Sequence, residues 1–246
     1  MKLIHTGPIV SNRRVGPQLL GLGVLGAILL SANNASAQSQ TTLVNFNSNN
    51  GAHPYVGLLT DANGNLFGTT SSGGSGYGTV FELAMTANGY SATPTTLVNF
   101  NNSNGASPYA ALIADANGNL FGTTAAGGLG FGTVFNLAKT ATGYAATPTT
   151  LASFHYGDGA GPLAELIADA NGNLFGTTYG GFAAGTVFEL AKTATGYANT
   201  PSTLVGFNNI DGATPYAGLL ADANGNLFGT THLGGLFGLG TVFEVA

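Results

Sequence analysis

The chain has no cysteine and no tryptophan among its 246 residues, and only 6% of its residues are charged. Without cysteine there is no disulfide, no thiolate metal site, no lipid-modified cysteine and no cysteine nucleophile. Soluble proteins ordinarily devote roughly a quarter of their residues to Asp, Glu, Lys and Arg. Solubility must therefore come from Asn, Thr and Ser and from the backbone of segments rich in glycine, of which the chain has 40.

Positive charge is especially scarce after residue 37. Lys139 and Lys192 are the only basic residues there, against all 10 acidic residues of the chain, which gives a formal charge of −8 (2 − 10). A surface with so few cations cannot neutralise many phosphates. Nucleic acid is therefore not expected as a partner.

The first 37 residues have the organisation of an export signal. A basic region is followed by an apolar run and then by a small-residue cleavage motif, which is the order found in secretory signal peptides. These features are Lys2, Arg13 and Arg14, residues 19–30, and Ala35-Ser36-Ala37. We therefore predict that residues 1–37 are a signal peptide and that the mature chain, residues 38–246, begins at Gln38.

The apolar run has 12 residues, which is too short to span a bilayer comfortably, so cleavage is favoured over an uncleaved membrane anchor. Arg13-Arg14 would suit a twin-arginine signal, but the VGPQ that follows lacks the usual apolar continuation, and the Sec route is favoured. After Ala37 no apolar stretch is long enough to span a membrane. The mature protein is expected to be secreted or to reside in the periplasm or cell envelope.

The phrase DANGNLFGTT occurs four times, starting at residues 61, 115, 169 and 222. Its spacings of 54, 54 and 53 residues mark a tandem repeat with a period just above that of kelch repeats. Each unit contains four strand-like segments and no sustained helical period. In the second unit these segments read YAALIAD, NLFGTT, GTVFNLAK and PTTLASF. The phrase itself predicts a hairpin in which the Asp caps a tight turn.

Four strands per unit, joined by hairpins, are typical of a propeller blade, so we predict an all-β, four-bladed β-propeller of four-stranded repeats. Neighbouring apolar residues such as Val134 and Phe135 indicate middle strands that are buried on both faces. Phenylalanine recurs at three positions per unit, as expected of packing between blades. Proline cannot donate a ladder hydrogen bond, so Pro94, Pro148 and Pro201 place the strand after them at the outer edge. The YAALIAD segment is then nearest the axis.

The two ends of the repeat region complement each other. Residues 41–46 form a strand of the outer type, and the last unit shows only the first three strands. We predict that the N-terminal strand completes the last blade, because this removes the open sheet edge. If that strand were instead the innermost one, each repeat would be its own blade without a swap. A monomer is expected, although two chains could pair into a larger ring.

The repeated phrases resemble a known family. D-x-N-G-N-L-F-G-T-T, a Gly-Gly loop and then G-T-V-F-E-L are similar to the GloVer tandem repeats of exported bacterial proteins of the choice-of-anchor type. The resemblance covers residues 41–246. It implies a repeat architecture and a surface or secreted location, and it brings no established activity.

The acidic residue of each phrase is a candidate metal ligand. DANGN begins like an EF-hand loop, but no copy has the chelating Glu at the twelfth position, so a capped turn is favoured. If the first strand is innermost, four carboxylates surround one end of the axis, where a calcium ion would relieve their repulsion. These residues are Asp61, Asp115, Asp169 and Asp222. No other cofactor is expected, because the loose G-x-G-x-x-G segments precede strands rather than helices.

Two sets of loops differ between the units, one before the first strand and one between the second and third strands. Both are expected on the same face, and loops on a rigid scaffold are where binding usually resides. Carboxylates and amides can hydrogen-bond sugar hydroxyls, and aromatic rings can stack on a pyranose. The candidate ligand-binding residues are His53, Tyr77, His155, Tyr156, Asp158, Tyr179, Asp211 and His232.

These features favour a non-catalytic extracellular binding or adhesion module for a glycan or another surface polymer. The alternative is a purely structural surface or matrix repeat protein. A glycan-active hydrolase is the least favoured class, because the close acidic pair Asp158 and Glu165 lies within one unit rather than across a cleft. No G-x-S-x-G elbow is present, and no enzymatic activity is expected.

Overall fold

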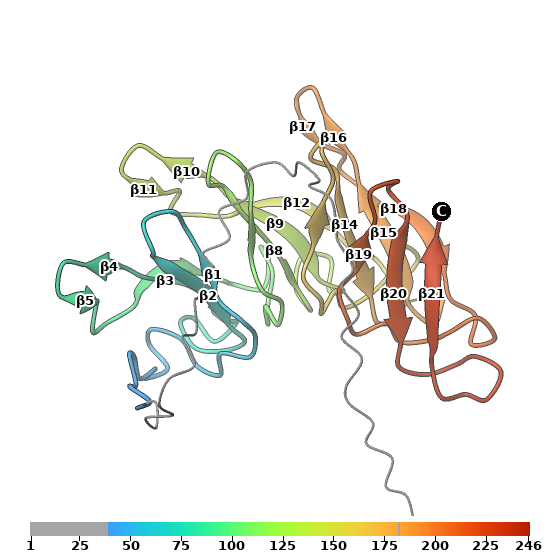
Figure 1. Cartoon of the computed structure of the whole chain (residues 1–246), viewed down its shortest axis with the longest axis horizontal. Coiled ribbons are helices and arrows are strands. Elements are labelled where there is room, and N and C mark those ends of the chain that lie inside the picture. Colours follow the sequence, from blue (N-terminus) through green and yellow to red (C-terminus); the bar gives the residue numbers. More distant parts are fainter. Residues whose placement is uncertain (1–38, 182) are drawn as a thin grey trace, which may run out of the picture. The chain divides into compact units, whose positions relative to one another are not determined.

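The computed structural model describes residues 39–181 and 183–246, so the predicted signal peptide lies outside the described residues. Every regular element in this part of the chain is a β-strand, which confirms the all-β prediction (Figure 1). No helix in these two ranges is long and apolar enough to cross a membrane. The strands all belong to residues 42–246, which form one structural unit.

Each of the first three repeats forms a four-stranded antiparallel sheet whose strands follow chain order from one edge to the other. The first sheet contains β1 (Leu59–Thr60), β2 (Leu66–Thr70), β3 (Thr79–Leu83) and β6 (Thr95–Asn99). The second contains β7 (Ile113–Ala114), β8 (Leu120–Thr124), β9 (Thr133–Leu137) and β12 (Thr149–Ser153). The third contains β13 (Ile167–Ala168), β14 (Leu174–Thr178), β15 (Thr186–Leu190) and β18 (Ser202–Gly206). The strands that follow the three prolines are edge strands, as predicted.

A two-stranded ribbon interrupts the connection between the third and fourth strands of these sheets (Figure 1). The ribbons are β4 (Met85–Thr86) with β5 (Gly89–Tyr90), β10 (Lys139–Thr140) with β11 (Gly143–Tyr144), and β16 (Lys192–Thr193) with β17 (Gly196–Tyr197). The sequence predicted one continuous strand through Lys139, followed by a turn. The structure instead ends β9 at Leu137 and places the turn at the tip of the ribbon.

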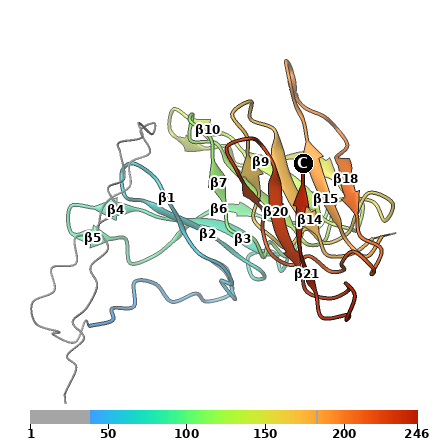
Figure 2. The ribbon, with the colours of Figure 1, turned by 45° about the vertical axis from the view of Figure 1, so that its right-hand side comes forward.

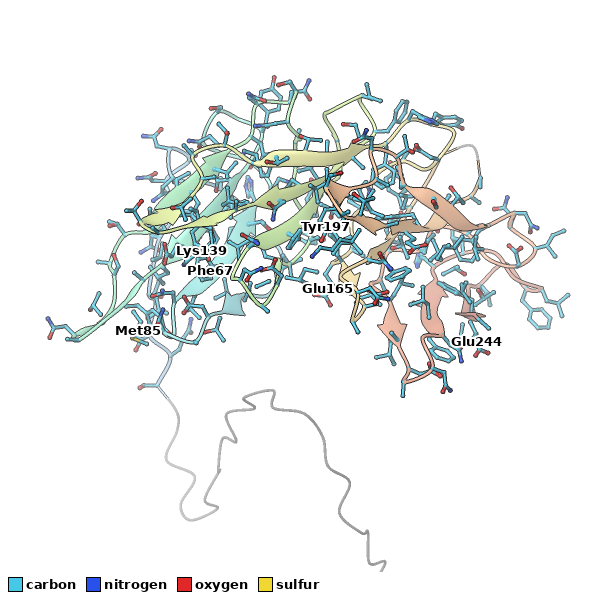
Figure 3. The ribbon with its side chains drawn as sticks, turned by 90° about the horizontal axis from the view of Figure 1, so that it is seen from above. Phe67, Met85, Lys139, Glu165, Tyr197 and Glu244 are labelled. Carbon is cyan, nitrogen blue, oxygen red and sulfur yellow. The ribbon has the colours of Figure 1, made fainter. Side chains whose placement is uncertain are left out.

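The ribbons of the second and third repeats tie each repeat to the one before it. The Tyr144 ring lies edge-on to Phe67 of the first sheet, with ring centroids 5.5 Å apart. Lys139 Nζ lies 4.2 Å from the centroid of the same tyrosine ring; Figure 3 labels Lys139 and Phe67. Tyr197 makes the equivalent contact with Phe121 of the second sheet, at 5.9 Å.

Three apolar cores fill the junctions between consecutive sheets. At each junction a phenylalanine just after the outer strand lies edge-on to a phenylalanine in the third strand of the next sheet. These pairs are Phe100–Phe135 at 5.1 Å, Phe154–Phe188 at 5.0 Å and Phe207–Phe243 at 5.0 Å between ring centroids. The recurring phenylalanines therefore pack between repeats, as predicted.

The fourth sheet has only three strands, β19 (Leu220–Ala221), β20 (Leu227–Thr231) and β21 (Thr241–Val245). Within the described ranges β21 pairs with β20 alone (Figures 1 and 2). The predicted pairing of residues 41–46 with this edge is not formed. Instead, Phe46 lies edge-on to Phe81 of the first sheet, at 5.0 Å, which repeats the phenylalanine contact of the other junctions. The N-terminal segment thus packs like an outer strand but does not pair like one.

The first half of the phrase DANGNLFGTT builds the turn and holds the ribbon. Asp61 Oδ1 accepts the backbone N–H groups of Asn63 and Asn65, each at 2.9 Å, and Asp61 Oδ2 accepts Asn65 Nδ2 at 3.0 Å. Gly64 adopts a φ of 82°, which glycine tolerates without a steric cost. Asn65 Oδ1 accepts the backbone N–H of Met85 at 2.9 Å, and so fixes the start of the ribbon.

The second half of the phrase joins neighbouring strands and sheets. Phe67 is buried in the core of the first junction. Thr69 Oγ1 donates to the carbonyl of Ala110 in the next repeat at 3.0 Å, and Thr70 Oγ1 lies 2.8 Å from Thr79 Oγ1 of the adjacent strand. The bond between repeats recurs as Thr123 to Ala164 at 3.2 Å and Thr177 to Ala217 at 3.1 Å. The phrase repeats because each junction needs the same set of contacts.

Candidate functional site

The two variable loop sets lie together in every repeat, as predicted. We call the loop before the first strand the leading loop (residues 47–58, 101–112, 155–166 and 208–219) and the loop between the second and third strands the middle loop (residues 71–78, 125–132, 179–185 and 232–240). One antiparallel bridge joins the two loops of each repeat. The bridged pairs are Ala52–Ser72, Ala106–Ala126, Ala160–Gly180 and Ala213–Leu233.

Each leading loop contains a residue in the left-handed conformation immediately before a proline. The φ values are 57° at His53, 53° at Ser107, 62° at Gly161 and 52° at Thr214. This conformation is strained for non-glycine residues and most of all for a β-branched residue such as Thr214. Its carbonyl accepts the first N–H of the middle loop in each repeat, for example from Ser71 to His53 at 3.1 Å. This hydrogen bond therefore holds the start of the Pro-Tyr segment, or Pro-Leu in the third repeat, against the middle loop.

The residues after these prolines converge on one hollow. Its volume is about 540 Å³, and it is lined by Tyr55, Val56, Tyr109, Leu163 and Tyr216, which come from all four repeats. A second hollow of about 520 Å³ shares three of these residues and continues along the segments that lead into the first strands. We call the two together the central hollow. Volumes of this size are usual for small-ligand sites.

Tyr216 brings together two of the predicted ligand-binding residues. Tyr179 stacks on Tyr216 with ring centroids 5.9 Å apart and an interplanar angle of 18°. The His232 ring lies 5.6 Å from the same tyrosine. Tyr55 and Tyr109 form a second, edge-on pair at 5.5 Å. Tyr55, Tyr179 and Tyr216 are exposed, so their rings can stack on a ligand or attract a cation.

None of the eight predicted ligand-binding residues lines the central hollow itself, and His53, Tyr77 and Tyr156 make contacts elsewhere. His53 Nδ1 lies 2.7 Å from Ser72 Oγ in the middle loop of the same repeat. The Tyr156 ring packs 5.9 Å from Phe131 of the preceding middle loop. Tyr77 is exposed, and its carbonyl accepts the Ser107 N–H at 2.9 Å. These side chains belong to the loop surface rather than to one site.

Asp158 and Asp211 stabilise their own leading loops. Asp158 Oδ1 accepts the His155 backbone N–H at 2.9 Å, and Asp211 Oδ1 accepts the equivalent N–H of Asn208 at 2.9 Å. Asn50 and Asn104 make the same contact in the first two repeats, to Asn47 and Asn101. His155 Nε2 also lies 3.1 Å from Asp158 Oδ2. The carboxylates that were predicted to meet a ligand thus act as turn acceptors, a role that Asn fills elsewhere.

The four repeated aspartates are each engaged in their own hairpin rather than around an axial ion. The contacts of Asp61 recur at Asp115, Asp169 and Asp222. Asp115 and Asp169 line one pocket of about 370 Å³, which Lys192 also lines. Across residues 39–181 and 183–246, no group of three or more His, Asp or Glu side chains could hold a metal ion. The predicted axial calcium site is therefore not assembled in this structure.

Glu165 is the charged residue that does line the central hollow. Its partner in the hydrolase alternative, Asp158, lines neither part of the hollow and is nearly buried in its loop. Glycoside hydrolysis requires two carboxylates that face each other across the bound sugar. Asp158 and Glu165 do not face each other across this hollow.

The sequence interpretation missed the three tyrosines of the hollow, Tyr55, Tyr109 and Tyr216. The signal was present, because a Pro-Tyr pair ends the variable part of three leading loops and becomes Pro-Leu at Leu163. These tyrosines belong to the segment that begins the first strand, YAALIAD in the second unit, for which no binding role was predicted. Equivalent positions of successive repeats nevertheless converge on this hollow and can form one site.

These observations define a tandem-repeat β-sheet protein whose repeated phrases build the junctions and whose loops surround a tyrosine-lined hollow. The family profile described as the Gloeobacter/Verrucomicrobia repeat matches residues 30–243, and the chain belongs to this family. The resemblance found in the sequence is thereby confirmed.

The comparisons with individual proteins are more distant. No curated protein sequence matches the chain. A solved structure of luciferin-regenerating enzyme is similar at 14% identity with a TM-score of 0.45, covering 71% of this chain and 52% of the enzyme. The chain thus spans about half the length of that structure.

Proposed function

We propose that the mature chain is a non-catalytic extracellular binding module that recognises a glycan or another surface polymer in the central hollow. The observation that carries this proposal is the convergence of tyrosines from three repeats, Tyr55, Tyr109 and Tyr216, on one hollow. Tyrosine combines a large apolar face with a polar tip, so it can stack on a pyranose and hydrogen-bond its hydroxyls. No catalytic group and no cofactor is required.

Binding to a glycan array tests the proposal directly. The mature protein is compared with Tyr216→Ala, which removes the ring that contacts both Tyr179 and His232. Tyr90→Ala is the matched control, since Tyr90 lies in the β5 ribbon and does not line the hollow. We expect Tyr216→Ala to lose about tenfold or more in affinity, as aromatic anchors in a pocket do. Equal binding by both variants would move the site elsewhere.

Export is part of this proposal. The basic region, apolar run and Ala35-Ser36-Ala37 motif support cleavage before Gln38 and a secreted or cell-envelope location. N-terminal sequencing of the exported protein is expected to begin at Gln38. A different first residue would contradict the cleavage site, and retention of Met1 in the membrane would contradict the signal peptide.

A purely structural role is the second candidate function. The observation that favours it is the engagement of Asp158, Asp211 and His53 within their own loops, which leaves fewer polar groups for a ligand. Failure of the mature protein to bind any glycan on the array would support this alternative.

We further propose that the four sheets close into a four-bladed propeller in which residues 41–46 pair with the free edge of β21. Three features support closure: β21 lacks an outer partner in the described ranges, residues 41–46 have the sequence of an outer strand, and Phe46 is already in its junction contact. An unpaired edge is a site of aggregation, and closure removes it.

Deletion of residues 41–46 tests closure. We expect the shortened protein to aggregate or to lose cooperative unfolding, because the last sheet keeps an open edge. A deletion variant as soluble and stable as the parent would contradict the proposal. The mass in solution is expected to be that of a monomer, and a dimer would show that two chains close a larger ring instead.

A further inference from the structure

Among the described residues that line the central hollow, one is charged, and it breaks the repeat. Glu165 occupies the position that is Gly57, Ala111 and Gly218 in the other three repeats. All four positions line the second part of the hollow. No Lys, Arg or His of residues 39–181 and 183–246 lines either part. The hollow therefore joins tyrosine rings and apolar side chains to one negative charge.

The side chain of Glu165 extends over the fourth repeat. A Cβ atom added at Gly218 would lie 3.1 Å from Glu165 Cγ, so the absence of a side chain there leaves room for the glutamate. Gly218 is two residues from Tyr216, which lines both parts of the hollow. Figure 3 labels Glu165 on the segment that leads into β13. Glu165 is thus exposed and lines the same part of the hollow as Tyr216, whose ring contacts Tyr179 and His232.

No cation of the described chain neutralises Glu165. In residues 39–181 and 183–246, the one ion pair within 4.0 Å joins His155 and Asp158. The two lysines lie over tyrosine rings of the ribbons, Lys139 at 4.2 Å from the Tyr144 centroid and Lys192 at 5.9 Å from the Tyr197 centroid. A cationic group on a ligand can therefore pair with Glu165 without displacing a cation of the described residues.

We propose that the hollow selects a glycan with a free ammonium group, that is, an amino sugar without its N-acetyl group. This inference rests on the proposed function and names its ligand class. Glu165 pairs with the ammonium group through a charge-assisted hydrogen bond, which is stronger than a bond between neutral groups. The faces of Tyr55, Tyr109 and Tyr216 attract the same cation and stack on the sugar ring.

The test compares two oligosaccharides that differ only at the nitrogen. Calorimetric titration of the mature protein with a glucosamine tetramer and with an N-acetylglucosamine tetramer measures the preference. We expect the amine form to bind about tenfold more tightly, because it gains one charge-assisted hydrogen bond. Glu165→Gln keeps the size of the side chain and is expected to bring the two affinities within about twofold of each other.

Glu244→Gln is the matched control, because Glu244 is an exposed glutamate on β21 that lines neither part of the hollow (Figure 3). It is expected to keep the full preference. Raising the salt from 0.05 M to 1 M is expected to shrink the preference of the parent, since salt screens an exposed ion pair.

The outcomes separate this inference from the proposed function. Equal affinity for both tetramers in the parent protein would overturn the ammonium inference and leave glycan binding in place. A preference that survives in Glu165→Gln would overturn the role of the carboxylate. Absence of binding to either tetramer, together with a negative glycan array, would overturn both proposals.

Discussion

The third strands of the four sheets have nearly the same sequence but different surroundings. They read TVFEL in β3 and β15, TVFNL in β9 and TVFEV in β21. Val80, Val134 and Val187 are completely buried, whereas Val242 is 82% exposed. The difference lies in the neighbour, because the valine face of each earlier strand packs on the next sheet. Local sequence therefore specifies the strand, and the adjacent repeat supplies its burial.

The first sheet shows the complementary difference on its opposite face. Leu58 is 54% exposed, whereas the equivalent Leu112, Leu166 and Leu219 are buried at the three interior junctions. The first and last sheets thus carry the two halves of an interior junction. The following predictions test how far these end sheets differ from the interior ones.

The largest effect is expected from a buried charge at the third-strand valine. Val134→Asp should lower the free energy of unfolding by about 4 kcal/mol or more, because an unpaired carboxylate would lie in the core. If the protein closes as proposed, Val242→Asp should approach that loss. Denaturant unfolding of both variants measures the comparison. A change within about 0.5 kcal/mol at Val242 is the value for an open surface position and would argue against closure.

A smaller effect is expected at the phenylalanine contacts between repeats. Phe154→Ala removes a completely buried ring that packs on Phe188, and should cost about 3–5 kcal/mol. Phe46→Ala removes the equivalent contact with Phe81 from a half-buried position, so we expect less than half that cost. Equal losses, measured by urea unfolding, would mean that the N-terminal segment is held as firmly as an interior strand.

Loss of one threonine hydrogen bond between repeats should lower the free energy of unfolding by about 1–3 kcal/mol. Thr123→Val keeps the shape of the side chain but leaves the Ala164 carbonyl without its donor, which costs about that much when the group is buried. Thr230, the equivalent residue of the last sheet, is exposed in the structure, so Thr230→Val should change stability by less than about 0.5 kcal/mol if the sheets stay open and should approach the loss at Thr123 if they close as proposed. Thermal unfolding of the two variants side by side distinguishes these outcomes, and a change below about 0.5 kcal/mol at Thr230 would contradict closure.

The smallest effect on stability comes from ionisation of the aspartates in the hairpin turns. It should be the same in the interior repeats and in the last repeat. Burial opposes ionisation of Asp169, but hydrogen bonds from Asn173 and Asn171 outweigh it and hold the pKa of Asp169 below its ordinary value. Bonds from Asn226 and Asn224 likewise lower the pKa of Asp222. Since both folded-state pKa values lie below those of the unfolded chain, this stabilisation is complete above the ordinary carboxyl pKa and is lost as the pH falls through the lowered values.

We expect Asp169→Asn and Asp222→Asn to reduce the acid sensitivity of unfolding by similar amounts, because both turns are local. Melting curves between about pH 2 and pH 6 measure this, a range that covers ordinary carboxyl titration. A much larger effect at one position would show that its carboxylate has partners outside the hairpin. The melting temperature is expected to be the same in calcium and in a chelator. A higher melting temperature in calcium would instead support the axial calcium site.

The strands, their order and the paired loops could be predicted because their determinants are local. Asp61 and Gly64 form a turn with residues at most four positions away, and Pro94 excludes its neighbour from a central strand. The contact between the β10–β11 ribbon and Phe67 could not be predicted, because it joins two different repeats. No pattern within one unit carries that contact.

The candidate site was harder to predict because it depends on convergence. Tyr55 and Tyr216 are 161 residues apart and meet only when four repeats are arranged around one hollow. Asp158 is of a residue type that often binds ligands, but in this structure it accepts a backbone N–H in its own turn. Asn104 accepts the equivalent N–H in the second repeat. Composition alone does not distinguish these roles.

The Thr69 bond to the next repeat has a consequence for how the gene can change. Its acceptor lies 41 residues ahead, and the same bond recurs at the next two junctions with nearly the same offset. An in-frame recombination event that removes or copies one whole unit would therefore place each threonine donor opposite an equivalent carbonyl acceptor. The new junction would have the same contacts as the existing ones. Natural variants that differ by whole units are thus expected to keep every junction intact, while the number of tyrosines around the hollow changes in single steps.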